Sequence, residues 1–390
     1  MDIKIIRKNE KLEDVLLGGN KILEVALPSM GNESFYDISL YDPAQNSILS
    51  IAPEIKKYNF IPVYNCIWNS ADVYFASYEE GAEHEITISL YRFNETAAET
   101  EEILKFTEKS IIVRGYKCIK LFVLTETQIL VQTEHKKDWE SKSLMGNIEF
   151  VQTIFDLNSS TSSQVNDLNF INNGINMIYP VSKTGIMLKT GYSYLEDERI
   201  SGESENDALI ESVYFGSMAL LLSALSKESA TVGFKMLATT YFDKCILSPR
   251  VDEDYIYFSI ADSANKTVET IFFNHKTEET FRCLTENTDP SDAGSGYVAG
   301  NVPYVKNYIE GRTEFLNLRT SDVDCVFYDD NLEAVNGRLI IFSKKKKNKD
   351  FIRVYRYPKL DLLLEEEGSF NSLCRDDDHY YIYISENNND

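Results

Sequence analysis

The chain repeats one pattern: a polar or acidic turn is followed by a short run of aromatic and β-branched residues. Runs of this kind favour β-strands, because branched and aromatic side chains pack well on a pleated surface. A single copy cannot bury its apolar face, so a chain of copies is expected to stack them against one another. The clearest copies are Ser70–Ala76, Glu126–Gln132, Lys183–Lys189, Asp252–Ser259, Asn336–Phe342 and Asp376–Ile384.

Each copy extends to four predicted strands, a to d, of which the repeated run is strand b. Strand c ends in an aromatic residue and a polar turn, and strand d follows that turn. A Cys-Ile pair recurs on strand a, at Cys66, Cys118 and Cys245, with a looser copy at Cys374. Reduced structural thiols on the narrow inner strands are the favoured interpretation, and a metal-binding ring of thiols is the alternative. The b strands are predicted to begin near residues 22, 73, 129, 186, 255, 302, 338 and 380.

The repeat resembles the β-propeller superfamily over nearly the whole chain, and its spacing brackets the roughly 40 to 50 residues of known propeller blades. The Trp-Asp mark of WD repeats and the paired glycines of kelch repeats are missing, so no specific family is identified. We predict an all-β chain, a single propeller domain over residues 1–390, with four-stranded antiparallel blades. The count is seven, with six or eight as alternatives. Closure of the ring is predicted between strands in 370–385 and strands in 35–52.

One stretch departs from the repeat. Apolar residues between Glu205 and Ser229, among them Val213, Met218 and Leu222, have a spacing that favours a helix. We therefore predict a helical insertion near 205–229, whose apolar stripe packs on the propeller or docks a partner. A strand over Ser212–Gly216 is the alternative.

Charge and targeting signals narrow the class of protein. Asp and Glu total 62 against 39 Lys and Arg, which gives a formal charge of −23. A nucleic acid or an anionic bilayer is repelled by such a field, so neither is an expected partner. The sequence shows neither an apolar run of membrane-spanning length nor a secretory signal, which predicts a cytoplasmic protein.

Known catalytic and cofactor motifs are missing. The sequence contains no HExxH, GxSxG, phosphate-binding loop or dinucleotide fingerprint, and its six cysteines never form a Cys-x-x-Cys pair. We predict no catalytic residue, no metal and no cofactor. The acidic turns at Asp252–Asp254 and Asp376–Asp378 resemble calcium-binding clusters, but solvated turns are the favoured interpretation.

Binding is therefore the leading hypothesis. Aromatic residues near the starts of inner strands are expected to gather at one mouth of the central channel, where flat rings bind sugars or peptide side chains; packing between blades is the alternative. Two arginines lie close to inner strands. The candidate ligand-binding residues are Tyr64, Trp68, Tyr116, Tyr179, Phe242, Arg250 and Arg375.

The sequence favours a non-catalytic propeller that binds a protein, a small molecule or a carbohydrate through a channel mouth or a loop face. The alternative is a propeller hydrolase or lyase acting on a carbohydrate or a peptide. A pair of ionisable side chains at the mouth with perturbed pKa values would favour the enzyme.

Overall fold

A computed structural model describes most of the chain. The description covers residues 2–8, 12–18, 21–26, 37–51, 66–69, 72–109, 119–136, 138–140, 148–159, 161–165, 175–182, 184–190, 211–225, 233–240, 244–262, 264–286, 296–299, 301–307, 312–318, 320, 322–327, 332–347, 349–376 and 378–385.

The described strands form seven four-stranded antiparallel sheets and one three-stranded sheet, which we number in chain order. The first sheet consists of β2 (Leu12–Gly18), β3 (Lys21–Ala26), β4 (Asp37–Asp42) and β5 (Ser47–Ser50), and the second of β6 (Cys66–Asn69), β7 (Asp72–Glu80), β8 (Glu85–Asn94) and β9 (Glu99–Lys109). The third sheet consists of β10 (Ile119–Thr125), β11 (Gln128–Lys136), β12 (Ile148–Asp156) and β13 (Thr161–Val165), and the fourth of β14 (Ile175–Pro180), β15 (Gly185–Thr190), β16 (Glu211–Ser217) and β17 (Lys235–Thr240).

The second half of the chain continues in the same way. Its sheets are β18 (Lys244–Asp252), β19 (Tyr255–Asp262), β20 (Thr267–Asn274) and β21 (Thr280–Glu286); β22 (Gly296–Ala299), β23 (Val302–Asn307), β24 (Arg312–Asn317) and β25 (Asp322–Phe327); β26 (Leu332–Asn336), β27 (Leu339–Lys346), β28 (Lys349–Arg356) and β29 (Asp361–Glu367); and the three-stranded eighth sheet of β30 (Ser369–Arg375), β31 (His379–Ser385) and β1 (Asp2–Lys8).

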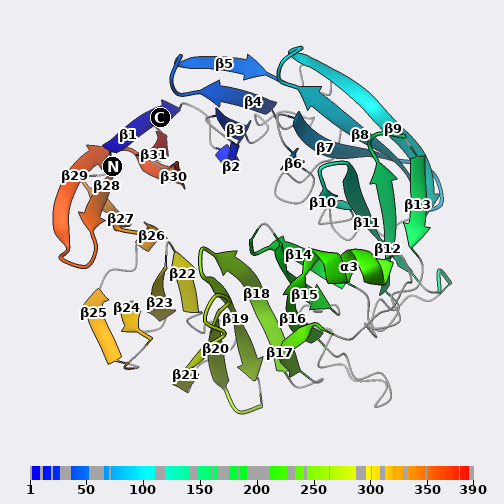
Figure 1. The fold of residues 1–390 in the computed structure, drawn as a ribbon. Helices are drawn as coiled ribbons and strands as arrows, with labels where there is room; N and C mark the ends of the chain where they lie inside the picture. The colour runs from blue at the N-terminus through cyan, green and yellow to red at the C-terminus, as the bar shows by residue number, and fades with distance from the viewer. Residues whose placement is uncertain are drawn as a thin grey trace.

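The sheets stand in a ring, with the first strand of each nearest the axis and the later strands toward the rim (Figure 1). This is a β-propeller, and the predicted seven four-stranded blades are confirmed, with the three-stranded sheet beside them in the ring. All eight predicted b strands are confirmed as the second strands of their sheets, from β3 to β31.

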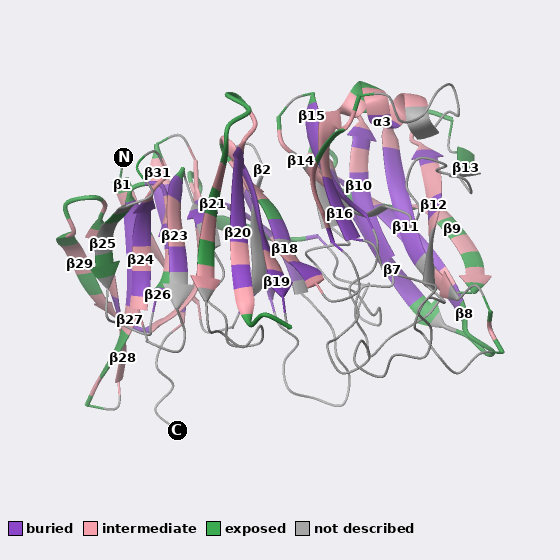
Figure 2. Cartoon of the chain, turned by 90° about the horizontal axis from the view of Figure 1, so that it is seen from below, coloured by how far each residue is buried: buried purple, intermediate pink, exposed green. Residues whose placement is uncertain are grey.

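Burial explains why the b strands stand out in the sequence. Each lies inside its sheet, and both its faces are covered by neighbouring sheets, so β15 is buried at every position. A strand covered on both faces has a continuous apolar run instead of alternation. The outermost strands have the opposite character. β5 is exposed throughout, and β29 has exposed and partly buried positions but no buried one (Figure 2).

The predicted pairing of the ring closure is wrong. Of the strands within residues 35–52, β4 pairs with β3 and β5 pairs with β4, so both belong to the first sheet. The strand that joins β31 is β1, which runs parallel to it from Asp2 beside His379 to Lys8 beside Ser385, and so the first and last described strands lie in one sheet (Figure 1). Ile3 and Ile5 pack toward the seventh sheet and Ile6 toward the first, which gives this N-terminal strand its apolar contacts.

The predicted helical insertion is partly wrong. Residues 211–217 form strand β16, the third strand of the fourth sheet, as the strand alternative predicts. Only α3 (Met218–Leu225) is helical among the described residues of 205–229, and residues 205–210 and 226–229 lie outside them. The strand is favoured because Glu211, which is fully buried, forms an ion pair of 2.9 Å with Lys189 on β15 and accepts a hydrogen bond from the Ile246 amide.

Helix α3 covers part of the propeller. Leu221 is fully buried, and Met218 and Leu222 pack with it against apolar residues of the third and fourth sheets. The apolar stripe is therefore used within the ring, as one of the two sequence interpretations expects. Among the described residues, no helix has the length and apolarity that a membrane crossing requires.

Two ion pairs hold the C-terminal end of β1 to its neighbours. Lys8 is 2.8 Å from Glu24 on β3, whose side chain is only 4% exposed, and Arg7 is 2.8 Å from Glu366 on β29, where both side chains are about 40% exposed. The buried carboxylate also raises the pKa of Tyr383, after the larger effect of burial. The two pairs are chemically similar but differ in solvent access.

We therefore expect Lys8→Ala to destabilise the protein far more than Arg7→Ala. Removal of Lys8 leaves a buried carboxylate without its cation, which costs about 3 kcal/mol, whereas an exposed pair contributes less than about 1 kcal/mol. Urea unfolding of the two variants and the wild type measures the difference. Equal shifts of the two midpoints would contradict this account of the closure.

Candidate functional site at the a–b face

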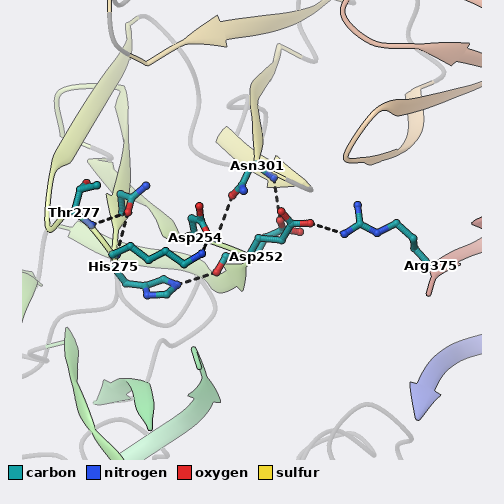
Figure 3. A network of polar contacts seen from close by, with 9 residues as sticks. Asp252, Asp254, His275, Thr277, Asn301 and Arg375 are labelled. Carbon is teal, nitrogen blue, oxygen red and sulfur yellow. Dashed lines mark hydrogen bonds and ion pairs between the residues drawn. The ribbon is translucent and has the colours of Figure 1, made fainter. Parts of the chain in front are cut away.

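The described turns between first and second strands lie on one face of the ring, which we call the a–b face. In the fifth sheet this turn follows β18 and presents Glu253 at its tip. In the eighth sheet Arg375 ends β30, immediately before the corresponding turn. The guanidinium of Arg375 donates a hydrogen bond of 2.7 Å to the Glu253 carboxylate. This contact, which we call the axial bridge, joins the fifth sheet to the eighth past the two sheets between them (Figure 3).

The turn that carries Glu253 is held by the neighbouring sixth sheet. The Asp254 amide donates to the side-chain oxygen of Asn301 at 3.1 Å, and the Asn301 amide donates to Asp252 at 3.4 Å. Glu253 and Asn301 both have positive φ, 42° and 63°. Asparagine tolerates this conformation well, so it suits the tight turn that faces the acidic one.

The next hairpin of the fifth sheet supports the same turn from the other side. His275 Nε2 donates to the Glu253 carbonyl at 2.8 Å, and the His275 amide donates to the Asp254 carbonyl at 2.9 Å. Lys276 forms an ion pair with Asp254. The backbone of Glu253 is thus fixed on both sides, while its carboxylate accepts the hydrogen bond from Arg375.

Arg375 is held in turn by its own sheet. Its guanidinium lies 5.9 Å from the ring centroid of Tyr380 on β31. Burial lowers the pKa of Arg375, but hydrogen bonds to Tyr380 and Glu253 outweigh burial and raise the pKa above its ordinary value. The guanidinium of Arg375 therefore stays protonated and charged near neutral pH. An arginine–carboxylate pair of this kind can bind and orient a charged ligand.

The turn next to Arg375 is ordered by Asp376. One carboxylate oxygen accepts hydrogen bonds from the amides of Asp378 at 2.8 Å and His379 at 2.6 Å, and the other accepts from the Tyr381 hydroxyl at 2.7 Å. Burial raises the pKa of Asp376, but these bonds outweigh burial and hold it below its ordinary value. Both ends of the axial bridge therefore stand on turns fixed by several hydrogen bonds.

The carboxylates of the two acidic turns contact other residues of the same chain. These carboxylates contact Asn301, Lys276, Arg375 and Tyr381 as described above. Across the described part of the chain, no group of three or more His, Cys, Asp or Glu side chains is arranged to hold a metal ion. These contacts favour the turn interpretation for both acidic segments.

The structure describes some of the candidate ligand-binding residues and not others. Tyr64, Tyr116 and Phe242 lie outside the described residues. Trp68 is in β6, where its backbone pairs with Val73. Tyr179 in β14 is half-buried and packs on a cluster shared by the fourth and fifth sheets. The ligand-binding role of all five stays a prediction.

The two candidate arginines lie on the inner strands of different sheets. Arg250 in β18 is exposed and pairs across the ladder with Tyr257. Arg375 is one half of the axial bridge. The structure thus joins one predicted residue, Arg375, to Glu253, which the sequence analysis considered only as part of an acidic turn.

His275 and Asn301, which hold the Glu253 turn, were not among the candidates. The available signal was the acidic turn itself, together with Asn301 in a Gly-Asn turn before β23. Nothing local indicates that these turns meet, because Glu253 and Asn301 are on different sheets.

The recurring cysteines lie on inner strands, as predicted, where they are described: Cys66 in β6, Cys245 in β18 and Cys374 in β30. Cys118 is outside the described residues. Cys245 and Cys374 are both buried. Burial, with smaller contributions from Asp376 and Glu24, raises the pKa of Cys374 to about 12, which makes its thiol unreactive at neutral pH.

No family model matches the chain, and no curated protein matches it. Solved structures do resemble it. A prolyl endopeptidase has a TM-score of 0.50 at 9% identity, over 92% of this chain and 50% of that one. Dipeptidyl peptidase 4 of Porphyromonas gingivalis has a TM-score of 0.49 at 10% identity, over 94% and 54%. An oligogalacturonate lyase in complex with manganese has a TM-score of 0.45 at 9% identity, over 87% and 86%.

The chain spans about half the length of the two peptidases that it resembles. At such low identities the likeness extends to the fold alone. The activities named for those proteins therefore describe them and not this chain.

The charged hydrogen bonds of Asp376 predict a pH-dependent contribution to stability. Because its folded pKa is depressed, the stabilisation is present above the unfolded value, near 3.9, and is lost as the pH falls through the folded value. We expect Asp376→Asn to lower the free energy of unfolding by about 1–2 kcal/mol at pH 7 and by less at pH 3. Urea unfolding at both pH values measures this.

Asp378→Asn is the control, since it removes a carboxylate from the same turn. We expect it to change stability by less than about 0.5 kcal/mol at either pH. A loss from Asp376→Asn that is as large at pH 3 as at pH 7 would show that the charge of this carboxylate is not what stabilises the turn.

Proposed function

We propose that this propeller is a non-catalytic binding protein that takes a basic ligand on its a–b face, with Glu253 as the anchoring carboxylate. The axial bridge is the single observation that carries the proposal. A guanidinium already sits on Glu253 in the protein, supplied by Arg375. A lysine or arginine side chain of a partner makes the same charge-assisted contact when it replaces Arg375.

The charge of the molecule supports a cationic ligand. The formal charge of −23 repels polyanions and attracts basic segments. The same sign prevails locally, since the turn of Glu253 also carries Asp252 and Asp254. Complementary charge of this kind speeds association and selects the partner.

Breaking the axial bridge also costs little free energy. The side chains of Arg375 and Glu253 are 31% and 36% exposed, and exposed ion pairs contribute about 1 kcal/mol or less. The turn of Glu253 does not depend on the bridge, because Asn301 and His275 hold its backbone. A ligand can therefore displace Arg375 without disordering its own binding site.

A hydrolase or lyase is the alternative from the sequence. The names of the similar structures belong to enzymes of both kinds. Arg375 and Glu253 are ionisable groups close together at the a–b face, but a permanently charged arginine is a poor proton carrier. The chemistry of this pair supports binding over catalysis. The proposed cytoplasmic location does not depend on which of these two functions the protein has.

A fluorescein-labelled peptide of alternating arginine and glycine tests the proposal by fluorescence anisotropy. We expect Glu253→Gln to weaken binding about tenfold, which corresponds to the loss of about 1.4 kcal/mol from one charged contact. Arg375→Ala should strengthen binding, because it removes the internal competitor. Chromatography of the peptide after incubation should show no cleavage.

The rim provides matched controls, since Arg282 and Glu269 form an exposed ion pair of 2.9 Å on the outer strands of the fifth sheet. Glu269→Gln and Arg282→Ala make the same charge changes and should leave the affinity unaltered. If Glu253→Gln and Glu269→Gln weaken binding equally, the peptide is attracted by net charge alone and the proposed site is wrong. Cleavage that depends on Glu253 would favour the enzyme.

A further inference from the structure

Among the described strands, the eighth sheet has one fewer than each of the other seven sheets. Among the described residues β1 pairs only with β31, so it occupies the third position from the axis and no described strand occupies the fourth. In the other sheets the fourth position is filled, by β29 in the seventh sheet and β5 in the first, which flank the eighth in the ring (Figure 1).

The hydrogen-bonding groups of this edge follow from the ladder. The Asp2 amide donates to the Asp378 carbonyl at 3.0 Å, so Asp2 points its backbone groups toward β31. Consecutive residues of a strand alternate in this respect. The backbone amides and carbonyls of Lys4, Ile6 and Lys8 therefore also face β31. Those of the three other residues, Ile3, Ile5 and Arg7, face outward, away from β31. They are spaced as a partner strand requires.

The side chains of β1 make the edge basic. It holds Lys4, Arg7 and Lys8 against a single Asp2, in a chain with a formal charge of −23. Arg7 and Lys8 are neutralised by Glu366 and Glu24. Lys4 is exposed and lies 5.4 Å from the centroid of the Tyr381 ring, and no described carboxylate pairs with it.

An apolar side chain lies beside the same edge. Ile48 on β5 is 59% exposed, more than any other large apolar residue of the described chain. It pairs across the ladder with Tyr41, which packs with Tyr381 and Tyr383 of the eighth sheet. Residues paired across a ladder share a face, so Ile48 is on the side of β5 that faces the eighth sheet.

We propose that the outer edge of β1 binds an extended, acidic and apolar segment of a partner protein, which adds as the fourth strand of the eighth sheet. Its backbone pairs with Ile3, Ile5 and Arg7, a carboxylate meets Lys4, and an apolar side chain covers Ile48. Strand addition of this kind takes its affinity from the backbone and its selectivity from alternate side chains. A second copy of this chain fits poorly, because two β1 edges would bring like charges together.

A seven-residue labelled peptide of alternating valine and glutamate tests the proposal, with a valine–lysine peptide as its matched partner. We expect the glutamate peptide to bind at least tenfold more tightly than the lysine peptide by fluorescence anisotropy, and Lys4→Glu to reverse this preference. Lys235→Glu, on the outer strand of the fourth sheet, is the control and should keep the preference.

Amide hydrogen exchange with the glutamate peptide present identifies strand addition itself. Exchange at Ile3, Ile5 and Arg7 should slow at least tenfold, while exchange at Lys4, Ile6 and Lys8 should stay as it was. Binding without this alternating protection, or an equal affinity for both peptides, would overturn the proposal. Neither result depends on the a–b face, so Glu253→Gln should leave the binding of this peptide unchanged.

Discussion

The backbone pairing of β1 with β31 is the interaction on which the ring depends. Seven sheets are each built from one continuous segment, but the eighth takes its third strand from the other end of the chain. This strand contacts both neighbouring sheets, through Ile3 and Ile5 on one side and Ile6 on the other. The closure therefore places sheets five and eight at a fixed separation, which the axial bridge between Glu253 and Arg375 requires.

Rigid turns connect this architecture to the proposed function. The groups that meet in the axial bridge are Arg375 at the end of β30 and Glu253 at the tip of the turn after β18. Asn301 and His275 fix one such tip and Asp376 fixes the other. A charged side chain held on an ordered backbone loses little entropy when a ligand arrives, which favours binding at these positions.

The repeat could be predicted because its strongest signal is local. Strands buried on both faces have apolar runs that the sequence displays, as at Ile256–Phe258 and Ile340–Phe342, so the b strands were found in the correct places. The closure was missed because Ile3, Ile5 and Ile6 alternate with charges, and their partner strand lies at the far end of the chain. The apolar spacing of residues 211–217 fits both a helix and a strand, and the buried ion pair between Glu211 and Lys189 favours the strand. The axial bridge joins residues 122 positions apart, which no local pattern encodes.

Residue-resolved amide hydrogen exchange of the free protein tests the closure most directly. If β1 is paired with β31 in solution, the amides of Lys4, Ile6 and Lys8 exchange as slowly as those of the β31 core, because both sets open only when the ring opens. Exchange of these three amides at the rate of an unstructured peptide, with β31 still protected, would contradict the closure and the site geometry that depends on it.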